Sequence, residues 1–387
     1  MITSLLDNDQ YKFTMQQATL KLGFAATPVQ YKFKCRTPNI DFNPYIKNIK
    51  EQISALAGLK LEKTELEFLR GIRYLSEEYL SFLKNFRFDP DLVKCSILDN
   101  ELSLLINGPW FQTILFEVPI LAIISEIYTT SQPEYSIRVA HNNLSDKIDF
   151  LLRTPDIGGF KFSELGTRRR ASLGLQYRLI SRLKTKLKQY FTGTSNLYLA
   201  MQHDVPSFGT MAHEWLQAHQ QLGYRVADSQ KMAFENWVKV YRGDLGIALS
   251  DVINTDAFLK DFNDPLFYKL FDGVREDSEP TPANFAYKMI RFYSNRNIEP
   301  MRKNIVFSNS LNFEKSVELF TEFKHLIGTR FGIGTFLSND CGVKPLNIVI
   351  KMIRCNGQPV AKISNSPGKG MCPSPEFETY LKSVYGV

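Results

Sequence analysis

Residues 160–190 read FKFSELGTRRRASLGLQYRLISRLKTKLKQY, and this stretch decides how we interpret the fold. The apolar segment 160–166 predicts a strand, and residues 171–190 predict a long helix directly after it. The pattern recurs along the chain, with a strand and then a helix at 245–251 and 256–262, at 267–274 and 284–294, and at 305–308 and 313–326. Because strands that alternate with helices form parallel sheets, we expect an α/β fold whose ligand site lies at the carboxyl ends of the strands.

A strand with strict alternation precedes this region at residues 29–36. Its odd-numbered residues are apolar, and its even-numbered residues are Gln30, Lys32, Lys34 and Arg36. A period of two predicts a half-buried strand with a basic outer face.

The two ends of the chain have a mixed pattern of helices and strands. Leucines at helical spacing predict helices between residues 61 and 84, and residues 92–106 predict a hairpin. Residues 114–128 predict a buried helix that Pro119 either kinks or restarts. Paired strands return after about residue 345, at 346–354 and 359–363.

These segments predict two domains, which agrees with a length of 387 residues at roughly 100–200 residues per domain. Residues 131–345 would form an irregular β/α barrel. Residues 1–130 would form an α+β domain that the returning segment 346–387 completes.

The charge balance favours an anionic partner. The chain has 47 Lys and Arg against 40 Asp and Glu, a net charge of +7. This modest excess suits a nucleic acid, a membrane surface or a phosphorylated metabolite without choosing among them.

The cysteines and the apolar segments indicate a cytoplasmic protein. The five cysteines are scattered and never spaced as CxxC, which argues against a disulfide framework or a structural zinc site. The start of the chain lacks the basic and apolar regions of a signal peptide. The longest apolar run, residues 118–124, is much shorter than the roughly 20 residues that span a bilayer.

Small and polar residues follow the expected strands, where a ligand site would lie. Gly332-Ile-Gly-Thr335 could hold a phosphate, because glycines let backbone N–H groups turn toward an anion, although an ordinary glycine turn explains it equally well. The chain contains neither GxxxxGK[ST] nor GxGxxG, which argues against a Walker-type site.

Three consecutive arginines, Arg168 to Arg170, follow the first strand of this region. Guanidinium groups match phosphate oxygens in a bidentate geometry, so these side chains could clamp a phosphate. Three adjacent residues cannot all face one site, and at most one or two of them would be functional. The alternative is a solvated helix start.

His213 is the histidine with the most suggestive setting, since it follows Gly209-Thr210 at an expected strand end. An imidazole can act as a base or as a nucleophile near neutral pH, and it needs a carboxylate to orient it. Asp251, at the end of a nearby strand, is the candidate. A structural role remains the alternative for a lone histidine.

Residues 182–188 are basic enough to suggest RNA binding. They lack interleaved aromatic residues, and their leucines suit the apolar side of an amphipathic helix. A solvated helix face is the preferred interpretation, and a non-catalytic RNA-binding protein is an alternative for the whole chain.

Taken in order, these motifs resemble bacterial nicotinate phosphoribosyltransferases. The resemblance runs from residues 5–12 to residues 366–369, nearly the whole chain. Its most specific pieces are Gly166-Thr-Arg-Arg-Arg170, Gly193-Thr-Ser-Asn196, Ala212-His-Glu-Trp215, Phe331-Gly-Ile-Gly-Thr335 and Lys344-Pro-Leu-Asn-Ile-Val-Ile-Lys351.

The resemblance implies an enzyme of NAD salvage. It would join nicotinate to 5-phosphoribosyl 1-diphosphate, giving nicotinate mononucleotide and diphosphate. ATP hydrolysis would be coupled to this reaction through a phosphohistidine at His213, with Asp251 as its orienting carboxylate and Mg²⁺ as a further cofactor. The partners would be small molecules and a second copy of the chain in a homodimer with shared active sites, with neither nucleic acid nor a membrane.

The resemblance also implies roles for individual residues. Tyr11 would stack on the pyridine ring and Arg36 would contact diphosphate or ATP, both across the dimer. The other implied substrate contacts are Leu165, Arg168, Ser195, Thr210, Arg275, Asp277, Asn309, Gly334 and Thr335, and the implied phosphate contacts of the returning segment are Lys362 and Lys369. Among these, Arg168 would bind diphosphate, Asp277 and Asn309 the ribose hydroxyls, and Gly334 and Thr335 the 5-phosphate.

The chain departs from its relatives at three positions. Residues 276–281 read Glu-Asp-Ser-Glu-Pro-Thr where close relatives have a His-Asp-Ser-Gly-Asp-Pro type segment. Leu165 replaces a phenylalanine that stacks on the base, and Asn309 replaces an aspartate after Ser308. A second alternative is a nicotinamide phosphoribosyltransferase. Relatives that are specific for the amide have an aspartate at the position of Ser195, and an aspartate would repel the carboxylate of nicotinate, so Ser195 favours the acid.

Overall fold

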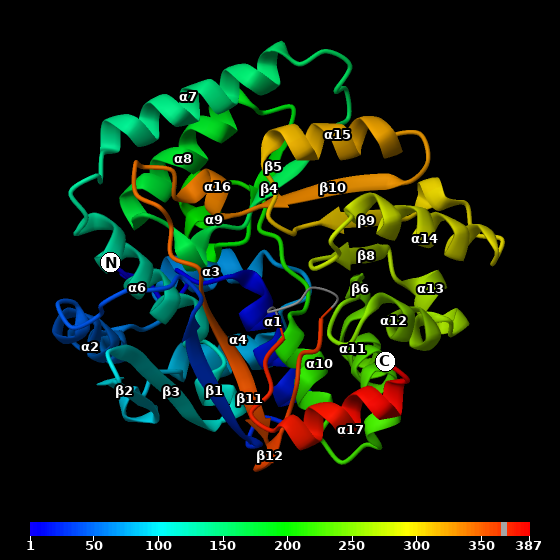
Figure 1. Cartoon of the computed structure of the whole chain (residues 1–387), viewed down its shortest axis with the longest axis horizontal. Helices are drawn as coiled ribbons and strands as arrows, with labels where there is room; N and C mark the ends of the chain where they lie inside the picture. The colour runs from blue at the N-terminus through cyan, green and yellow to red at the C-terminus, as the bar shows by residue number, and fades with distance from the viewer. Residues whose placement is uncertain (365–369) are drawn as a thin grey trace.

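A six-stranded parallel sheet forms one part of the protein (Figure 1). The structure, a computed structural model, describes residues 1–364 and 370–387. The strand order is β5-β4-β10-β9-β8-β7. The strands are β4 (Phe162–Glu164), β5 (Phe191–Thr194), β7 (Ile247–Leu249), β8 (Gly273–Glu276), β9 (Asn304–Phe307) and β10 (Gly328–Ile333). The parallel pairing confirms the α/β fold expected from the alternation of strands and helices.

Crossover helices lie along the outer side of this sheet, where they form a rim in Figure 1. Their apolar sides pack on a hydrophobic core shared with the rest of the chain. The helices of this part are α7 (Ile137–Arg153), α8 (Leu173–Lys186), α9 (Leu197–His203), α11 (Ser229–Tyr241), α12 (Thr255–Phe262), α13 (Pro265–Leu270), α14 (Pro282–Ser294), α15 (Phe313–Phe323) and α16 (Thr335–Ser338).

One strand prediction was wrong over half of the predicted segment. Residues 267–274 were expected to be extended, but α13 runs from Pro265 to Leu270 and the strand β8 begins only at Gly273. Asp264 caps α13, since its carboxylate accepts a hydrogen bond from the N–H of Leu266 at 3.0 Å. A capping aspartate followed by proline at the first helical position is a strong helix start, and it outweighs the apolar pattern here.

The two edge strands of the parallel sheet, β5 and β7, are connected through an irregular segment rather than by a ladder among the described residues. The N–H of Thr194 on β5 donates to Pro206, and the N–H of Phe208 donates back to Thr194 at 2.9 Å. The Thr210 hydroxyl then donates to the carbonyl of Ile247 on β7 at 3.2 Å. The segment 206–210 therefore lies between the two edges.

Close contact at this edge requires Gly193, whose φ is +145°. A Cβ atom at this position would lie 2.0 Å from the carbonyl oxygen of Pro206. Any other residue would push the segment 206–210 away from β5.

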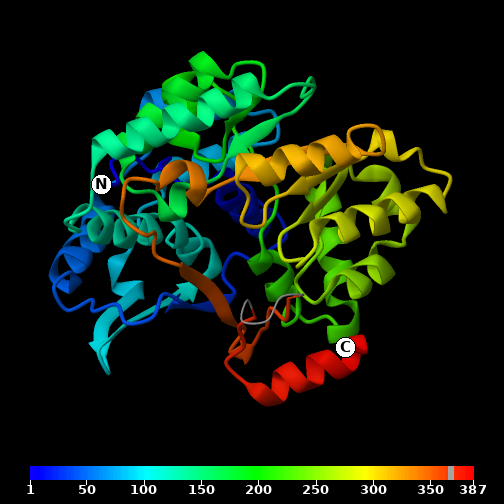
Figure 2. The same cartoon turned by 45° about the horizontal axis from the view of Figure 1, so that its top comes forward.

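A five-stranded antiparallel sheet combines strands from the N-terminal and C-terminal regions of the chain, in the order β12-β11-β1-β3-β2 (Figures 1 and 2). The strands are β1 (Pro28–Cys35), β2 (Val93–Leu98), β3 (Glu101–Pro109), β11 (Ile348–Cys355) and β12 (Gln358–Pro359). Since β11 pairs with β1 in the centre of the sheet, the expectation that the C-terminal segment returns to the N-terminal region is confirmed. The register places Lys32 opposite Lys351 on the basic outer face.

The helices of the N-terminal region confirm most of the expected pattern. They are α2 (Ile46–Ala55), α3 (Lys63–Arg70), α4 (Glu77–Asn85), α5 (Trp110–Thr113) and α6 (Glu117–Thr130), and α17 (Pro375–Tyr385) ends the chain. Pro119 lies in the first turn of α6 and so marks a new helix start rather than a kink. By length and composition the stretch Trp110–Thr130 could cross a membrane, but 83% of its most apolar window is buried inside the protein, as in a core helix.

A polar helix in the centre of the protein, α1 (Gln10–Lys21), had not been expected from the sequence. Residues 10–19 are all buried, although many of them are polar. The polar side chains have partners: Gln10 donates to the carbonyl of Gly209 at 2.9 Å and Gln17 donates to that of Tyr74 at 2.8 Å. A helix buried on every side has no apolar face, so periodicity carries no signal for it.

Candidate active site

His213, Asp251 and Lys362 form a tight cluster at the carboxyl edge of the parallel sheet. His213 begins α10 (His213–His219), Asp251 follows β7, and Lys362 follows β12. The His213 Nε2 atom lies 2.8 Å from Asp251 Oδ1 and 2.6 Å from Lys362 Nζ, and Lys362 Nζ also lies 2.6 Å from Asp251 Oδ2. The expected pairing of His213 with Asp251 is present, and Lys362 joins it from the other end of the chain. Lys369 lies outside the described residues.

Burial of this cluster favours a neutral imidazole. Burial lowers the pKa of His213 to about 4, with Lys362 adding to the effect and Asp251 opposing it. Burial would raise the pKa of Asp251, but His213 and Lys362 together hold it well below its usual value. One nitrogen cannot donate to Asp251 and accept from Lys362 at once, so the two residues compete for Nε2.

Arg275 and Asp277, both expected at the site, lie beside this cluster. The Arg275 guanidinium donates to Asp277 Oδ2 at 3.0 Å and to the Ser308 hydroxyl at 2.9 Å, and Ser308 donates to Asp277 Oδ1 at 3.0 Å. Asp277 Oδ2 is 4.0 Å from His213 Nε2. Burial raises the pKa of Asp277, but Arg275 opposes this effect and the net shift is downward.

The three arginines after β4 diverge, as expected for adjacent residues. Arg168 is 41% exposed and its Nη1 lies 3.4 Å from Glu117 Oε1. Arg169 donates to the carbonyl of Ile348 at 3.0 Å. Arg170 is fully buried and forms a bidentate ion pair with Asp7, with two bonds of 2.7 Å. Arg168 is therefore the arginine available to a ligand, and Arg170 has a structural role.

Tyr11, Ser195 and Asp9 meet near Arg168. Tyr11 and the carboxylates of Glu117 and Asp9 outweigh burial and raise the pKa of the Arg168 guanidinium. The Ser195 hydroxyl donates to Asp9 Oδ1 at 2.7 Å. Burial raises the pKa of Asp9, and Arg168 and Ser195 partly oppose this effect. Asp9 was not expected at the site, although it belongs to the N-terminal motif that carries the resemblance.

The glycine turn after β10 lies against the turn after β4. A Cβ atom on Gly334 would lie 3.1 Å from the carbonyl oxygen of Leu165, and Thr335 begins the short helix α16. Asn309 follows β9, and its amide donates to the carbonyl of Glu279 at 3.3 Å. Leu165, Asn309, Gly334 and Thr335 therefore all lie at the edge that contains His213.

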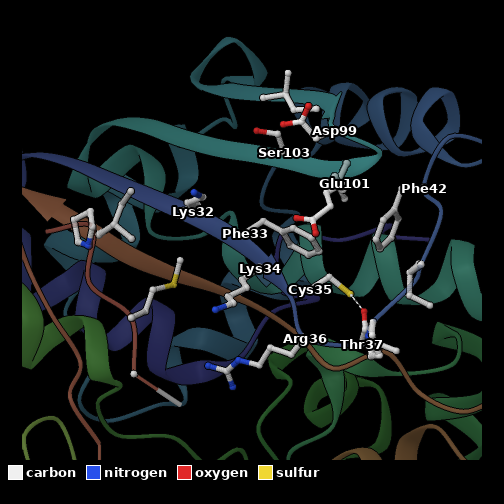
Figure 3. Close-up of a pocket in the computed structure, with 18 of the residues that line it drawn as sticks. Lys32, Phe33, Lys34, Cys35, Arg36, Thr37, Phe42, Asp99, Glu101 and Ser103 are labelled. Carbon is white, nitrogen blue, oxygen red and sulfur yellow. Dashed lines mark hydrogen bonds between the residues drawn. The ribbon is translucent and has the colours of Figure 1, made fainter. Parts of the chain in front are cut away.

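Arg36 lies on the open side of the five-stranded sheet, in line with Lys32 and Lys34 (Figure 3). These side chains line a groove of ≈ 1400 Å³ that Ile363 and Ser364 border on the other side. Ile363, the residue after Lys362, is part of the lining of this groove.

Several positive groups lie near one another beyond the lining of the groove, close to Arg36. Burial, together with Lys362 and Arg36, lowers the pKa of Lys351 to about 7. Burial, Arg168 and Arg36 lower the pKa of Arg169 to about 10. Lys351 was missed as a site residue, although its place opposite Lys32 in two alternating strands would have put it on the basic face.

Glu164, at the end of β4, connects two walls of the site and was also missed. One carboxylate oxygen accepts the N–H of Gly166 at 2.6 Å and the amide of Gln176 at 3.0 Å, and the other accepts the hydroxyl of Thr194 at 2.6 Å. Burial raises the pKa of Glu164 to about 7 even though these hydrogen bonds lower it. A lone carboxylate in an apolar strand is the signal that could have identified it.

The Glu164→Gln variant should change the pH dependence of stability. Between about pH 4.5 and pH 7 the folded protein keeps a proton on Glu164 that the unfolded chain releases, so wild-type stability falls as pH rises through this window. Relative to wild type, the variant should therefore gain about 3 kcal/mol of unfolding free energy between pH 4.5 and pH 8. Urea unfolding at both pH values measures the difference. A gap between the two proteins that stays constant with pH would contradict the prediction.

The comparisons with known proteins agree along the whole chain. The model of the nicotinate phosphoribosyltransferase family matches residues 160–387, and the model of the N-terminal domain of the same family matches residues 6–125. The chain belongs to the nicotinate phosphoribosyltransferase family. This membership confirms the resemblance, and it favours an enzyme over an RNA-binding protein.

Individual members of the family are similar over their full length. A nicotinate phosphoribosyltransferase of Burkholderia ambifaria is 45% identical over 393 residues, which cover 100% of this chain and 97% of the relative. Crystal structures of the enzymes from Vibrio cholerae and Porphyromonas gingivalis superpose with TM-scores of 0.96 and 0.92 at 36% and 34% identity. Each superposition covers 100% of this chain. It covers 94% of the Vibrio cholerae chain and 100% of the Porphyromonas gingivalis chain.

One feature bears on the shared active sites that the resemblance implied. Tyr11 and Arg36 were expected to reach the site from a neighbouring subunit. In the structure the backbone of Tyr11 lies against Gly209, and the N–H of Arg36 donates to the carbonyl of Asn347 at 2.7 Å, all within one chain. The reason is that α1 and β1 pack directly against the sheet edge: the N–H of Gln10 donates to the carbonyl of Ser195 at 2.8 Å.

Proposed function

We propose that the chain joins nicotinate to 5-phosphoribosyl 1-diphosphate, giving nicotinate mononucleotide and diphosphate, and that ATP hydrolysis through phosphorylated His213 drives the reaction. The observation that carries the proposal is the convergence of His213, Asp251 and Lys362 beside Arg275 and Asp277 at one sheet edge. A phosphorylated histidine needs a carboxylate on one nitrogen and cations for the phosphoryl oxygens, and this cluster offers both.

In the transfer step, the nitrogen of nicotinate attacks the anomeric carbon and diphosphate leaves with a large negative charge. The protein has to position the two reactants and to stabilise the leaving group. Arg168, which is partly exposed, is the proposed contact of the diphosphate, and Arg275 is proposed to reach the substrate. Gly334 and Thr335 would hold the 5-phosphate, with Asp277 and Asn309 at the ribose hydroxyls.

The residues present fit a magnesium ion. His213, Asp251 and Asp277 each offer a ligand atom, and these atoms lie within 4.8 Å of one another. Mg²⁺ prefers carboxylate oxygens, so Asp251 and Asp277 would hold it in place of their present partners Lys362 and Arg275. Bound there, it would neutralise negative charge on the phosphate groups of the substrates.

His213 would accept the phosphoryl group of ATP on Nδ1. When Asp251 takes the Nε2–H, the lone pair lies on Nδ1, and the low pKa keeps the ring neutral at physiological pH. Lys362 then has to leave Nε2, and its ammonium becomes available to a phosphate oxygen. The basic groove with Lys32, Lys34 and Arg36 is the proposed approach of ATP, while Lys369 remains a predicted phosphate contact.

The assay that tests the proposal measures nicotinate mononucleotide synthesis from nicotinate and 5-phosphoribosyl 1-diphosphate, with and without ATP. We expect product in both cases and more product per unit time with ATP. If wild-type protein forms no product and hydrolyses no ATP, the proposal is wrong. A nicotinamide phosphoribosyltransferase is the second candidate, and competition between equal concentrations of both rings decides, with Ser195 supporting the acid.

The proposal also covers the oligomeric state and the domains of the protein. The homodimer with shared active sites stays a prediction, and we propose instead that each site is complete within one chain, because Gln10 and Tyr11 pack against Ser195 and Gly209 of their own chain. The irregular β/α barrel of residues 131–345, with segment 206–210 between β5 and β7, and the α+β domain of residues 1–130 and 346–387 are the proposed units. The cytoplasm is the proposed compartment.

Mixing two impaired variants, and measuring the ATP-coupled activity of the mixture, tests where each site is completed. Tyr11→Ala should weaken nicotinate binding by roughly 5- to 150-fold through lost stacking, and His213→Ala should lose ATP coupling. If sites were shared across a dimer, mixed dimers would regain one intact site and the mixture about a quarter of wild-type activity. The two variants are unfolded and refolded together. We expect the activity of the mixture not to exceed the sum of the activities of the two separate variants. Recovery would overturn the self-contained site.

A further inference from the structure

Four buried or partly buried charged side chains form a continuous series between Arg168 and the residue that follows His213. Arg168 Nη1 lies 3.4 Å from Glu117 Oε1, and Glu117 Oε2 lies 2.5 Å from Lys12 Nζ. Lys12 Nζ also pairs with Glu214 Oε2. We call Arg168, Glu117, Lys12 and Glu214 the charge ladder.

The ladder is balanced, and all of its members except the partly exposed Arg168 are almost shielded from water. It has two positive and two negative groups, the Lys12 side chain is 0% exposed, and those of Glu117 and Glu214 are 10% and 5% exposed. The second oxygen of Glu214 accepts hydrogen bonds from the Tyr31 hydroxyl and the Trp110 indole, each of 3.1 Å. Burial lowers the pKa of Lys12, but the two glutamates outweigh it and the net shift is upward, so the ammonium stays charged.

Stability does not explain this arrangement. Taking charges out of water costs about as much as their attraction returns, and apolar residues of similar size often do as well. Buried ion pairs are better suited to fixing one geometry, because leaving any member unpaired is costly. The two ends of the ladder indicate which geometry it fixes.

One end of the ladder lies at the histidine and the other at the diphosphate arginine. Glu214 directly follows His213 in the first turn of α10, so a movement of Glu214 moves the backbone of His213. Glu117 begins α6 and contacts Arg168. Lys12, on the central helix α1, contacts both Glu214 at the His213 end of the ladder and Glu117 at the Arg168 end.

We propose that Lys12 is a positioning residue that couples the phosphorylation state of His213 to the binding of diphosphate at Arg168. A phosphoryl group on His213 adds negative charge next to Glu214, and Lys12 divides its N–H donors between Glu214 and Glu117. A change in the ion pair between Lys12 and Glu214 therefore changes how strongly Lys12 pairs with Glu117. This in turn changes how strongly Glu117 pairs with Arg168. The inference rests on the proposed function and adds a coupling path to it.

The experiment measures the KM for 5-phosphoribosyl 1-diphosphate without and with saturating ATP, and takes the ratio. Coupling between two sites is usually roughly 5- to 150-fold, and we expect a wild-type ratio in this range and a ratio below about 2 for Lys12→Met. The double variant Lys12→Met/Glu214→Gln removes one charge of each sign, so it leaves the ladder neutral. It should fold even if the single variant does not, and should show the same loss of coupling.

Gln17→Met is the matched control. Gln17 is a fully buried polar residue of the same helix, and it bonds to Tyr74 and Tyr241 rather than to the ladder. This variant loosens α1 but should keep the wild-type ratio. A merely structural role of Lys12 would lower kcat in both proteins and leave both ratios unchanged.

The outcomes are distinguishable. If wild type makes no nicotinate mononucleotide, the proposed function itself fails. If wild type makes product but ATP leaves its KM unchanged, or if both Lys12 variants keep the wild-type ratio, the coupling role of Lys12 is wrong. A loss of the ratio in Gln17→Met would also overturn it, because then any damage to α1 would suffice.

Discussion

The His213→Ala variant is expected to lose all acid-labile phosphate and all ATP hydrolysis, while it keeps some transfer of the phosphoribosyl group. The imidazole is the only group that we propose to carry the phosphoryl group, so its removal eliminates that half of the reaction. The transfer step uses Arg168 and Arg275 instead, and these side chains do not contact His213. Incubation with radiolabelled ATP, followed by acid and base treatment of the denatured protein, measures the first effect.

His325→Ala is the control for this experiment. His325 is exposed and follows α15, away from the cluster. It should incorporate phosphate as wild type does. If His213→Ala still formed an acid-labile phosphoprotein, another residue would be the acceptor. If it lost transfer completely, the two half-reactions would not be separable as proposed.

Arg168→Met should have the second large effect, a fall of about 100- to 1000-fold in kcat/KM for 5-phosphoribosyl 1-diphosphate, as for other preorganised groups that stabilise developing charge. The guanidinium supplies positive charge where the diphosphate leaves, and Glu117 orients it. Arg168→Lys keeps the charge but loses the planar geometry, so it should fall between methionine and wild type. Steady-state kinetics at fixed ionic strength measure all three proteins.

Arg178→Met separates a local effect from a general electrostatic one. Arg178 is an exposed residue of α8, and its loss changes the net charge by the same amount. We expect its kinetics to equal those of wild type. An equal loss in both variants would mean that overall charge steers the substrate and that Arg168 has no special place.

Local pattern predicted much of the architecture. Alternation marked β1, and the strand–helix rhythm after residue 160 marked the parallel sheet. The prediction failed at α13, where a capped start outweighed an apolar run, and it missed α1, which is buried on all sides and has no apolar face. Periodicity reports the contrast between a buried and an exposed side, so it cannot find an element that lacks this contrast.

The candidate site was only partly visible for a related reason. Asp251 and Arg275 stand at strand ends, and the topology of a parallel sheet brings such residues to one edge. His213 was expected to follow a strand but instead begins α10, after the irregular segment 206–210. Burial and neighbouring residues shift the pKa values of Glu164, Lys351 and Asp9. No single stretch of sequence specifies these surroundings. Which residues share one electrostatic environment depends on packing.

The sequence by itself determined the family, the parallel sheet and the residue types at its carboxyl edge, because these depend on local order and spacing. Only the tertiary structure decided that Lys362 joins His213 and Asp251, that α1 packs against Ser195 and Gly209, and that Lys12 pairs with both Glu117 and Glu214. These contacts join parts of the chain that are far apart in sequence. Their strength comes from burial in a medium of low dielectric constant, which exists only in the folded protein.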